Sequence, residues 1–213
     1  MLTENMLRSL WPHGDSKIPG LVAAMAASAP TVFPKWGVTN DLIIAHAMAQ
    51  FSHECGAGTE VVENLNYCAA QLLKQWPTHF THAQAIAMQH QPRLIANQAY
   101  NGRMGNRLGT DDGWDHRGRG PAQTTGVEEY ARLGKVLGLP LAEHPDMINE
   151  PAHFLECGVA NLSIRGCIPY MAKDNIVAVS GLLNVGHIVP ANKIIGYSER
   201  VHWLSLWKHG LGC

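Results

Sequence analysis

Two glutamates nine residues apart, Glu54 and Glu63, have the setting in this sequence that best suits proton transfer. Glu54 follows the strongly apolar run of residues 42–51, and Gly56 comes two positions later. If the run forms a buried helix, Glu54 lies at its C-terminal end, where partial desolvation and the negative end of the helix dipole both favour the protonated carboxyl. A general acid must hold a proton in this way. Glu54 is therefore predicted to be one half of a proton-transfer site.

Glu63 is the first candidate for the other half. In glycoside hydrolysis a second carboxylate either attacks the sugar or activates a water molecule. Gly56 and Gly58 allow the chain to leave the helix, turn and present Glu63 across a cleft. A gap of about 6.5–9.5 Å between the carboxyl groups would give inversion at the sugar, and a gap of about 5 Å would give a covalent intermediate.

Simpler roles remain open for both glutamates. A glutamate after a helix is commonly a solvated end residue. Glu63 could be a surface charge, or the N-cap of a helix that follows Tyr67. Three other carboxylates could replace it as the base: Glu60, Asp112 and Asp115.

Helices are the elements expected to position these residues. The run at 42–51 predicts a mostly buried helix with Asn40 as its N-cap. Two scaffold helices are expected within residues 3–30, broken at 11–14 and 19–20. Loop or short extended structure is expected at 56–59 and 63–67. Further helical patterns lie at 68–75, 81–89, 93–100, 127–137, 151–163, 176–183 and 197–206.

Residues 101–120 are too rich in glycine, aspartate and arginine to form core. The interleaved Met104 and Trp114 favour an ordered functional loop over disorder. The arginines of this segment, Arg119 in particular, could pair with Asp111, Asp112 or glutamates.

The overall composition excludes several classes of protein. Sixteen Lys and Arg against seventeen Asp and Glu give a net charge of −1, which argues against a dedicated nucleic-acid binder or a basic membrane-surface protein. No apolar run reaches the roughly 18 residues that span a bilayer, and residues 1–8 lack the basic start and apolar middle of a signal peptide. The length favours a single domain over residues 1–213.

Cysteine and histidine usage predicts neither a disulfide framework nor a metal site. The five cysteines are odd in number and form no CxxC pair, which suits buried thiols in a reducing compartment. A Cys157–Cys167 bridge stays open as the alternative. The twelve histidines are scattered, and pairs such as His79 with His82 lack accompanying ligands. No metal and no other cofactor is expected.

Three ordered blocks of this sequence resemble a known family. The blocks are His53-Glu54-Cys55-Gly56, residues 63–67 (ENLNY) and residues 113–126 (GWDHRGRGPAQTTG). In order and spacing they resemble the glycoside hydrolase family 19 chitinases, and still more closely the bacterial and phage endolysins of that family. The likeness runs from the Trp11-Pro12 region to Arg200. It implies a mainly α, lysozyme-like α+β fold, with a single two-lobed helical domain and a substrate cleft.

The resemblance also implies roles for individual residues. Glu54 matches the family's general acid, and Glu63 matches the general base of its loop-poor bacterial members. Thr125 falls where the family has a hydroxyl that helps to hold the attacking water. An ST-turn or a helix N-cap before residues 127–137 is the alternative role for Thr125.

Substrate contacts are expected for six residues: His53, Tyr67, Trp114, Gln123, Asn184 and Arg200. The resemblance matches Gln123 to a residue that hydrogen-bonds substrate and Asn184 to the asparagine of the family's Asn-Gly-Gly motif, while Tyr67 and Trp114 could provide apolar platforms for sugar faces. Of the six, Arg200 resembles a late arginine that contacts the region of the catalytic carboxylate. Asn184 and Arg200 could equally be structural, and the two aromatic residues could be core residues. The sequence departs from the family pattern at Thr124 and Val185.

Two enzymatic functions fit these features. The first hypothesis is an endolysin-type glycosidase that hydrolyses the β-1,4 bond between N-acetylmuramic acid and N-acetylglucosamine in peptidoglycan, by a two-carboxylate, inverting mechanism. The alternative is a chitinase that acts on β-1,4-linked N-acetylglucosamine. The absence of a signal peptide, a chitin-binding module and a cysteine framework favours the endolysin. A catalytically inactive wall-binding protein on the same fold is the third hypothesis.

The endolysin hypothesis carries expectations about partners and location. The glycan is the expected partner, with no nucleic acid, no stable membrane insertion and a monomeric state. The protein would be made in a host cytoplasm and act on the cell wall or periplasm after release, and a holin could give it access.

Overall fold

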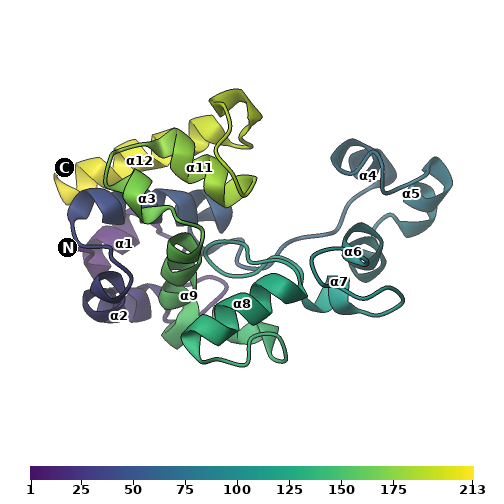
Figure 1. The fold of residues 1–213 in the computed structure, drawn as a ribbon, viewed down its shortest axis with the longest axis horizontal. Helices are drawn as coiled ribbons and strands as arrows, with labels where there is room; N and C mark the ends of the chain where they lie inside the picture. The colour runs from purple at the N-terminus through teal and green to yellow at the C-terminus, as the bar shows by residue number, and fades with distance from the viewer. The chain divides into compact units, whose positions relative to one another are not determined.

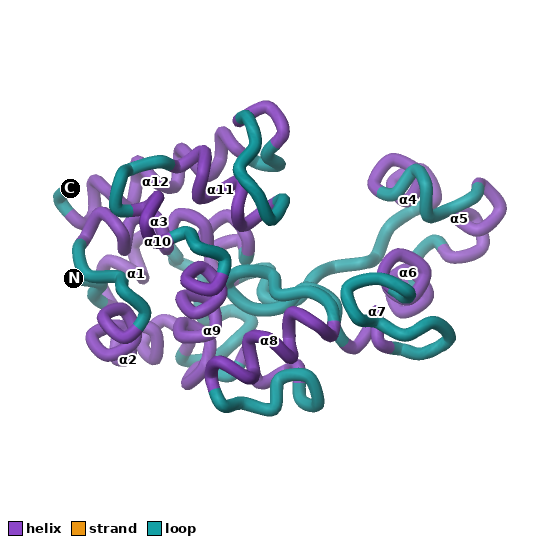
Figure 2. Tube along the Cα trace, in the orientation of Figure 1, coloured by secondary structure: helices purple, strands orange, loops and turns teal.

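The computed structural model describes residues 1–213 and confirms a mainly helical fold. It contains twelve α-helices and three short 3₁₀ helices. Figure 2 shows helices joined by loops, without a strand. β-type pairing is confined to two isolated bridges, Val62 with Arg119 and Arg119 with Thr124. None of the helices has both the length and the hydropathy needed to cross a membrane.

The chain forms two compact units, each made of separate stretches of sequence. The first unit consists of Met1–Val61, Gly120–Gln123 and Asp146–Cys213. The second consists of Val62–Arg119 and Thr124–Pro145. That the two units act as one catalytic domain over residues 1–213 stays a prediction.

The first unit is built around α3 (Asp41–Glu54). This helix packs along α12 (Tyr197–Leu211) and contacts α9 (Pro151–Ile164), α10 (Ile168–Met171) and α11 (Ile176–Asn184). Figure 1 shows α11 and α12 alongside α3. The helix α2 (Leu21–Lys35) packs on α9 and on α1 (Glu4–Leu10). Short 3₁₀ turns lie in the connections: η1 (Gly56–Gly58), η2 (Pro145–Asn149) and η3 (Ala191–Lys193).

Both a local signal and burial explain α3. The Asn40 side chain accepts a hydrogen bond from the Ile43 N–H at 3.0 Å, so the predicted N-cap is confirmed. Ten residues of the helix are buried, and packing therefore supplies most of its stability. The buried Ser52 hydroxyl accepts hydrogen bonds from the indoles of Trp11 and Trp207, each at 2.8 Å. The helix ends at Glu54, as the sequence predicts.

The second unit contains five helices, and three of them contribute buried residues to a small apolar core. The five helices are α4 (Ala69–Gln75), α5 (His82–Met88), α6 (Pro92–Tyr100), α7 (Asp112–Asp115) and α8 (Val127–Leu137). The core, to which α4, α5 and α6 contribute, consists of Leu65, Leu72, Phe80, Ala85, Ile95, Ala96 and Ala99. Aromatic side chains, Trp76 and Tyr100 among them, pack against it from partly exposed positions.

Ion pairs and the short helix α7 order the polar segment at 101–120. Arg93 pairs with Asp111, and Arg107 pairs with Asp112 at 2.8 Å. The aspartates are therefore held by these two arginines rather than by Arg119. Arg119 is buried, and it donates to backbone carbonyls within the same segment.

Several helix boundaries differ from the prediction. The helix α2 continues to Lys35 through Pro30 and Pro34, because its buried face continues through Val32 and Phe33 and outweighs the lost backbone hydrogen bonds. The helix α12 continues to Leu211, and the four-residue α10 was not predicted. Cys68 occupies the N-cap position of α4, so the role of Glu63 as a helix cap is wrong.

All five cysteines are free thiols, so a Cys157–Cys167 bridge is wrong. Cys55, Cys157 and Cys167 are buried. Burial raises the pKa of each of these three thiols to about 12, and they therefore stay protonated and unreactive.

Candidate active site

Glu54, the last residue of α3, forms an ion pair with Arg200 of α12. Its Oε1 lies 2.5 Å from Arg200 Nη2. The glutamate side chain is 15% exposed and the arginine side chain 1% exposed, so the pair is shielded from solvent. A guanidinium at this distance stabilises a carboxylate charge. This influence opposes the desolvation and helix dipole on which the sequence prediction rests.

Three acceptors hold the Arg200 guanidinium. Besides Glu54, they are the Gln50 side-chain oxygen, 2.5 Å from Nη1, and the Ile195 carbonyl, 3.2 Å from Nε. Gln50 in turn donates to the Ser180 hydroxyl at 3.1 Å. The sequence analysis selected neither Gln50 nor Ser180. The available signal was a glutamine inside an apolar helix, four residues before Glu54 and therefore on the same face.

His53 is half-buried and packs against the backbone of Gly196. A Cβ added to Gly196 would lie 2.0 Å from the imidazole Cε1, and the Gly196 φ of 67° also requires glycine. Burial, together with the positive charge of Arg200, lowers the pKa of His53. The ring is therefore neutral at physiological pH. Its contact with substrate stays a prediction.

Glu63 lies on the second unit, in the extended stretch after Val62. Its backbone N–H donates to the Gly118 carbonyl at 2.8 Å. Its carboxylate accepts one hydrogen bond on each oxygen: Oε1 from the Tyr100 hydroxyl at 2.6 Å, and Oε2 from the Gly118 N–H at 3.1 Å. Two donors fix the orientation of the carboxylate and stabilise the ionised form that a general base needs.

Tyr100, at the C-terminal end of α6, is a site residue that the sequence analysis did not select. Burial, followed by the charge and hydrogen bond of Glu63, raises the pKa of Tyr100 well above its usual range, so the hydroxyl stays a donor. The ring packs edge-on against Trp76, with centroids 6.1 Å apart. Tyr100 lies 37 residues from Glu63, and no local pattern signals the contact.

The segment Gly120–Gln123 belongs to the first unit and holds Gln123 in the left-handed region, at a φ of 47°. The Gln123 amide donates to the carbonyls of Glu60 and Gly120 at 3.1 and 3.3 Å. A Cβ on Gly120 would lie 2.2 Å from Ile148 Cγ2, so the close approach requires glycine. Such backbone strain often accompanies functional sites.

Thr125 is half-buried and precedes the N-cap of α8. Gly126 occupies the cap position with a φ of 86°, so the N-cap role for Thr125 is wrong. Asn106 supplies the side-chain cap, because its Oδ1 accepts from the Val127 N–H at 3.0 Å. The role of Thr125 in holding water stays a prediction.

Tyr67 and Trp114, the two expected sugar platforms, both pack against the apolar core of the second unit. The Tyr67 ring meets Trp76 edge-on at 5.5 Å. The Arg117 guanidinium lies 3.7 Å from the centroid of the Trp114 ring and covers one face of it. Core packing thus accounts for part of each ring, and sugar contact stays a prediction for both.

Asn184 ends α11 and closes the loop that leads to α12. Its Oδ1 accepts a hydrogen bond from the Ile195 N–H at 3.1 Å. The Ile195 carbonyl in turn accepts from Arg200. Asn184 therefore supports the arginine beside Glu54, whatever contact it makes with substrate.

The three alternative bases differ from Glu63 in their surroundings. Hydrogen bonds from Arg107 hold the pKa of Asp112 well below its usual range. Glu60 and Asp115 are exposed. Glu63 combines partial burial with neutral donors, which leaves it the best candidate among these carboxylates.

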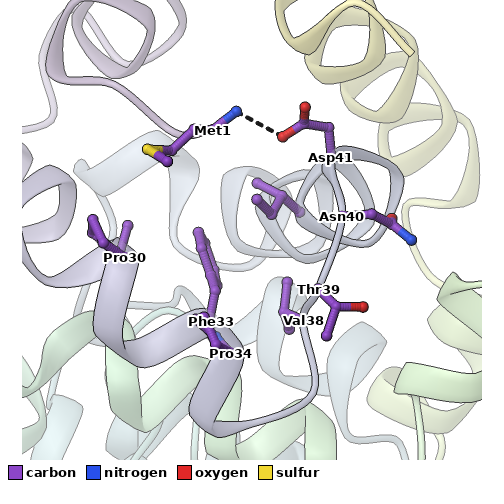
Figure 3. Close-up of a pocket in the computed structure, with 10 residues that line it drawn as sticks. Met1, Pro30, Phe33, Pro34, Val38, Thr39, Asn40 and Asp41 are labelled. Carbon is purple, nitrogen blue, oxygen red and sulfur yellow. Dashed lines mark hydrogen bonds and ion pairs between the residues drawn. The ribbon is translucent and has the colours of Figure 1, made fainter.

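A separate pocket of about 400 Å³ lies at the other end of α3 (Figure 3). Figure 3 shows the ring of Phe33 between Pro30 and Val38, and the Met1 ammonium group donates to Asp41 at 2.7 Å. At 1.5 Å of rise per residue, Asp41 and Glu54 lie roughly 20 Å apart along α3. The pocket is therefore not part of the candidate active site.

Known proteins resemble this chain in sequence and in fold. No protein-family model matches it. A protein of Haemophilus influenzae, described as a glycosyl hydrolase family 19 domain-containing protein, is 34% identical over 140 residues. The match covers 65% of this chain and 66% of the length of that relative.

Two solved chitinase structures share the fold. Chitinase C from Streptomyces griseus HUT6037 has a TM-score of 0.63 at 16% identity, over 99% of this chain and 92% of that one. A bacterial family 19 chitinase has a TM-score of 0.57 at 19% identity, over 99% and 94% of the two chains.

The fold and the sequence match define the class of protein as a glycoside hydrolase with a chitinase-like, mainly helical fold. The chain belongs to glycoside hydrolase family 19.

Proposed function

We propose that this chain hydrolyses β-1,4 glycosidic bonds with Glu54 as the general acid and Glu63 as the general base. The observation that carries the proposal is that the two carboxylates have different surroundings. Glu54 is paired with a buried cation, whereas Glu63 accepts hydrogen bonds from neutral donors. Two carboxylates with different environments can divide the acid and base tasks of glycoside hydrolysis.

The Arg200 ion pair suits an acid that must give up its proton. After Glu54 protonates the leaving oxygen, it becomes a carboxylate, and Arg200 stabilises that product of the transfer.

Glu63 takes the proton of the attacking water in this mechanism. The Tyr100 hydroxyl and the Gly118 N–H occupy one site on each carboxylate oxygen. An ionised carboxylate has about four acceptor sites, so sites remain for a water molecule. Thr125 and Gln123 would orient the water and the sugar. Water that attacks the face opposite the leaving group gives inversion, and the first product of a β-bond then carries the α anomer.

Peptidoglycan is the proposed substrate, cleaved between N-acetylmuramic acid and N-acetylglucosamine. Free thiols at all five cysteines suit a protein that folds in a reducing compartment, such as an endolysin made inside a cell. Action on the cell wall after release, access through a holin and a monomeric state belong to the same proposal. Chitin is the second candidate, favoured by the two structural neighbours that are named chitinases.

The products of digestion separate these functions. The protein is incubated with purified peptidoglycan and, separately, with chitin oligomers, and the products are analysed by mass spectrometry. Muropeptides that end in reducing N-acetylmuramic acid are the expected result. Soluble chito-oligomers alone would assign the chitinase function. Release of neither product would overturn the glycosidase proposal and favour an inactive wall-binding protein.

A further inference from the structure

A line of buried polar side chains leads from the interior of the first unit to Glu54. It consists of Ser180 on α11, Gln50 on α3 and Arg200 on α12, each at most 1% exposed. Gln50 lies one helical turn before Glu54. Buried polar groups of this kind are costly unless they are hydrogen-bonded, so the order of donors and acceptors along the line has physical consequences.

Arg200 fixes which end of the Gln50 amide faces it, and Ser180 holds the other end. The amide oxygen accepts from Arg200 Nη1 at 2.5 Å, and the amide nitrogen therefore faces the Ser180 hydroxyl, to which it donates at 3.1 Å. The opposite orientation would set the NH₂ group against a guanidinium, which has donors but no acceptor. The Gln50 amide can therefore satisfy both of its neighbours in one orientation only.

Gln50 binds Arg200 without neutralising its positive charge, which remains paired with Glu54. Its amide oxygen is a neutral acceptor, so it fixes the guanidinium without competing for the positive charge. The neighbouring charged or titratable groups are His53 on α3, Glu199 on α12 and Glu60 after η1. None of these three accepts a hydrogen bond from Arg200, whose partners are Ile195, Gln50 and Glu54.

We propose that Gln50, anchored by Ser180, is a positioning residue that sets Arg200 on Glu54 and thereby fixes the place and the charge of that carboxylate. The inference rests on the proposed role of Glu54 as the general acid. It adds two residues, neither of which touches substrate, to the machinery of proton donation.

Three substitutions test this role. Q50E gives Arg200 a second carboxylate to share, Q50M removes the acceptor at similar volume, and S180A removes the hydroxyl that anchors the amide nitrogen. V179A, a change of a fully buried apolar residue next to Ser180, is the matched control for loss of packing alone. It is expected to lower the melting temperature without altering the titration of Glu54.

The readout is the titration of the Glu54 carboxyl carbon by ¹³C NMR, assigned with E54Q. An Arg200 guanidinium that is shared or displaced stabilises the Glu54 carboxylate less. The midpoint of the Glu54 titration is therefore expected to rise by about one pH unit in Q50E and by less in Q50M and S180A. In a glycan-hydrolysis assay, the alkaline limb of the kcat profile should move upward by the same amount in Q50E.

Unchanged Glu54 midpoints in folded Q50E and Q50M would overturn the inference. If Q50M does not fold, the Glu54 midpoint in S180A tests the same role, because S180A removes the other hydrogen-bond partner of the Gln50 amide. A shift of equal size in V179A would also overturn it, because packing alone would then explain the effect. The NMR result does not depend on catalysis: shifted midpoints in a protein that cleaves neither glycan would refute the proposed function and leave the positioning role standing.

Discussion

Replacement of Tyr100 by phenylalanine tests the assignment of Glu63 as the base with little disturbance of the fold. The substitution removes the hydroxyl that lies 2.6 Å from Glu63 Oε1, and it keeps the ring that packs against Trp76. The Gly118 N–H still holds the other carboxylate oxygen. The change therefore isolates one hydrogen bond to the proposed base.

The size of the effect follows from the strength of that bond. A hydrogen bond to a charged group contributes about 1.5–3 kcal/mol. If it acts on a correctly placed, ionised base, its loss should lower kcat by roughly 10- to 100-fold, since about 1.36 kcal/mol corresponds to a factor of ten. KM should change little, because Tyr100 is not expected to bind substrate. A carboxylate that has lost a donor is protonated more readily, so the acidic limb of the kcat profile should move to higher pH.

The assay is the pH dependence of kcat and KM for Y100F on a soluble glycan fragment. Y170F, the same chemical change on α10 of the first unit, is the matched control and should match the wild type. An unchanged kcat and an unchanged acidic limb in Y100F would refute the assignment of Glu63. Another carboxylate would then have to activate the water.

Three further predictions concern the supports of the site. R200M should lower the free energy of unfolding in urea by about 3 kcal/mol, because it leaves Glu54 without its buried partner. A loss below about 1 kcal/mol would contradict a structural role for the pair. G196A should cost at least about 1–2 kcal/mol, since alanine is strained at this φ and its Cβ meets the His53 ring; an unshifted His53 NMR signal would contradict that contact. Asp112 has a lower pKa in the folded protein than in the unfolded chain, so its ionised carboxylate stabilises the fold at pH values above the unfolded-state pKa. This contribution is lost as the pH falls through the pKa of the folded state. D112N should therefore cost stability at neutral pH and much less at strongly acidic pH, and an equal cost at both would show that its ionisation does not contribute.

Local patterns in the sequence predicted the elements of the site better than its contacts. The helix α3, its cap at Asn40 and the terminal position of Glu54 follow from an apolar run, a capping residue and a glycine, all within a few neighbours. The short helix α10 and the extension of α2 beyond Pro30 depend on packing partners elsewhere in the chain. Propensity carries no information about such partners.

The contacts that complete the site connect distant parts of the sequence. Tyr100 reaches Glu63 across 37 residues, and Gln50 reaches Ser180 across 130. Arg200 was placed near the acid through family resemblance, because a pairing across 146 residues leaves no periodic signal. In the same way, the sequence could not tell that Asn106, rather than Thr125, caps α8.

The rate of peptidoglycan hydrolysis by E54Q, compared with the wild type, tests the central claim most directly. E60Q makes the same change at an exposed glutamate six residues later and serves as the matched control. The account predicts that E54Q folds and loses at least about a hundredfold in rate, the lower end for general acid catalysis, while E60Q stays near the wild-type rate. Wild-type activity in folded E54Q would remove Glu54 from the acid role and contradict the account.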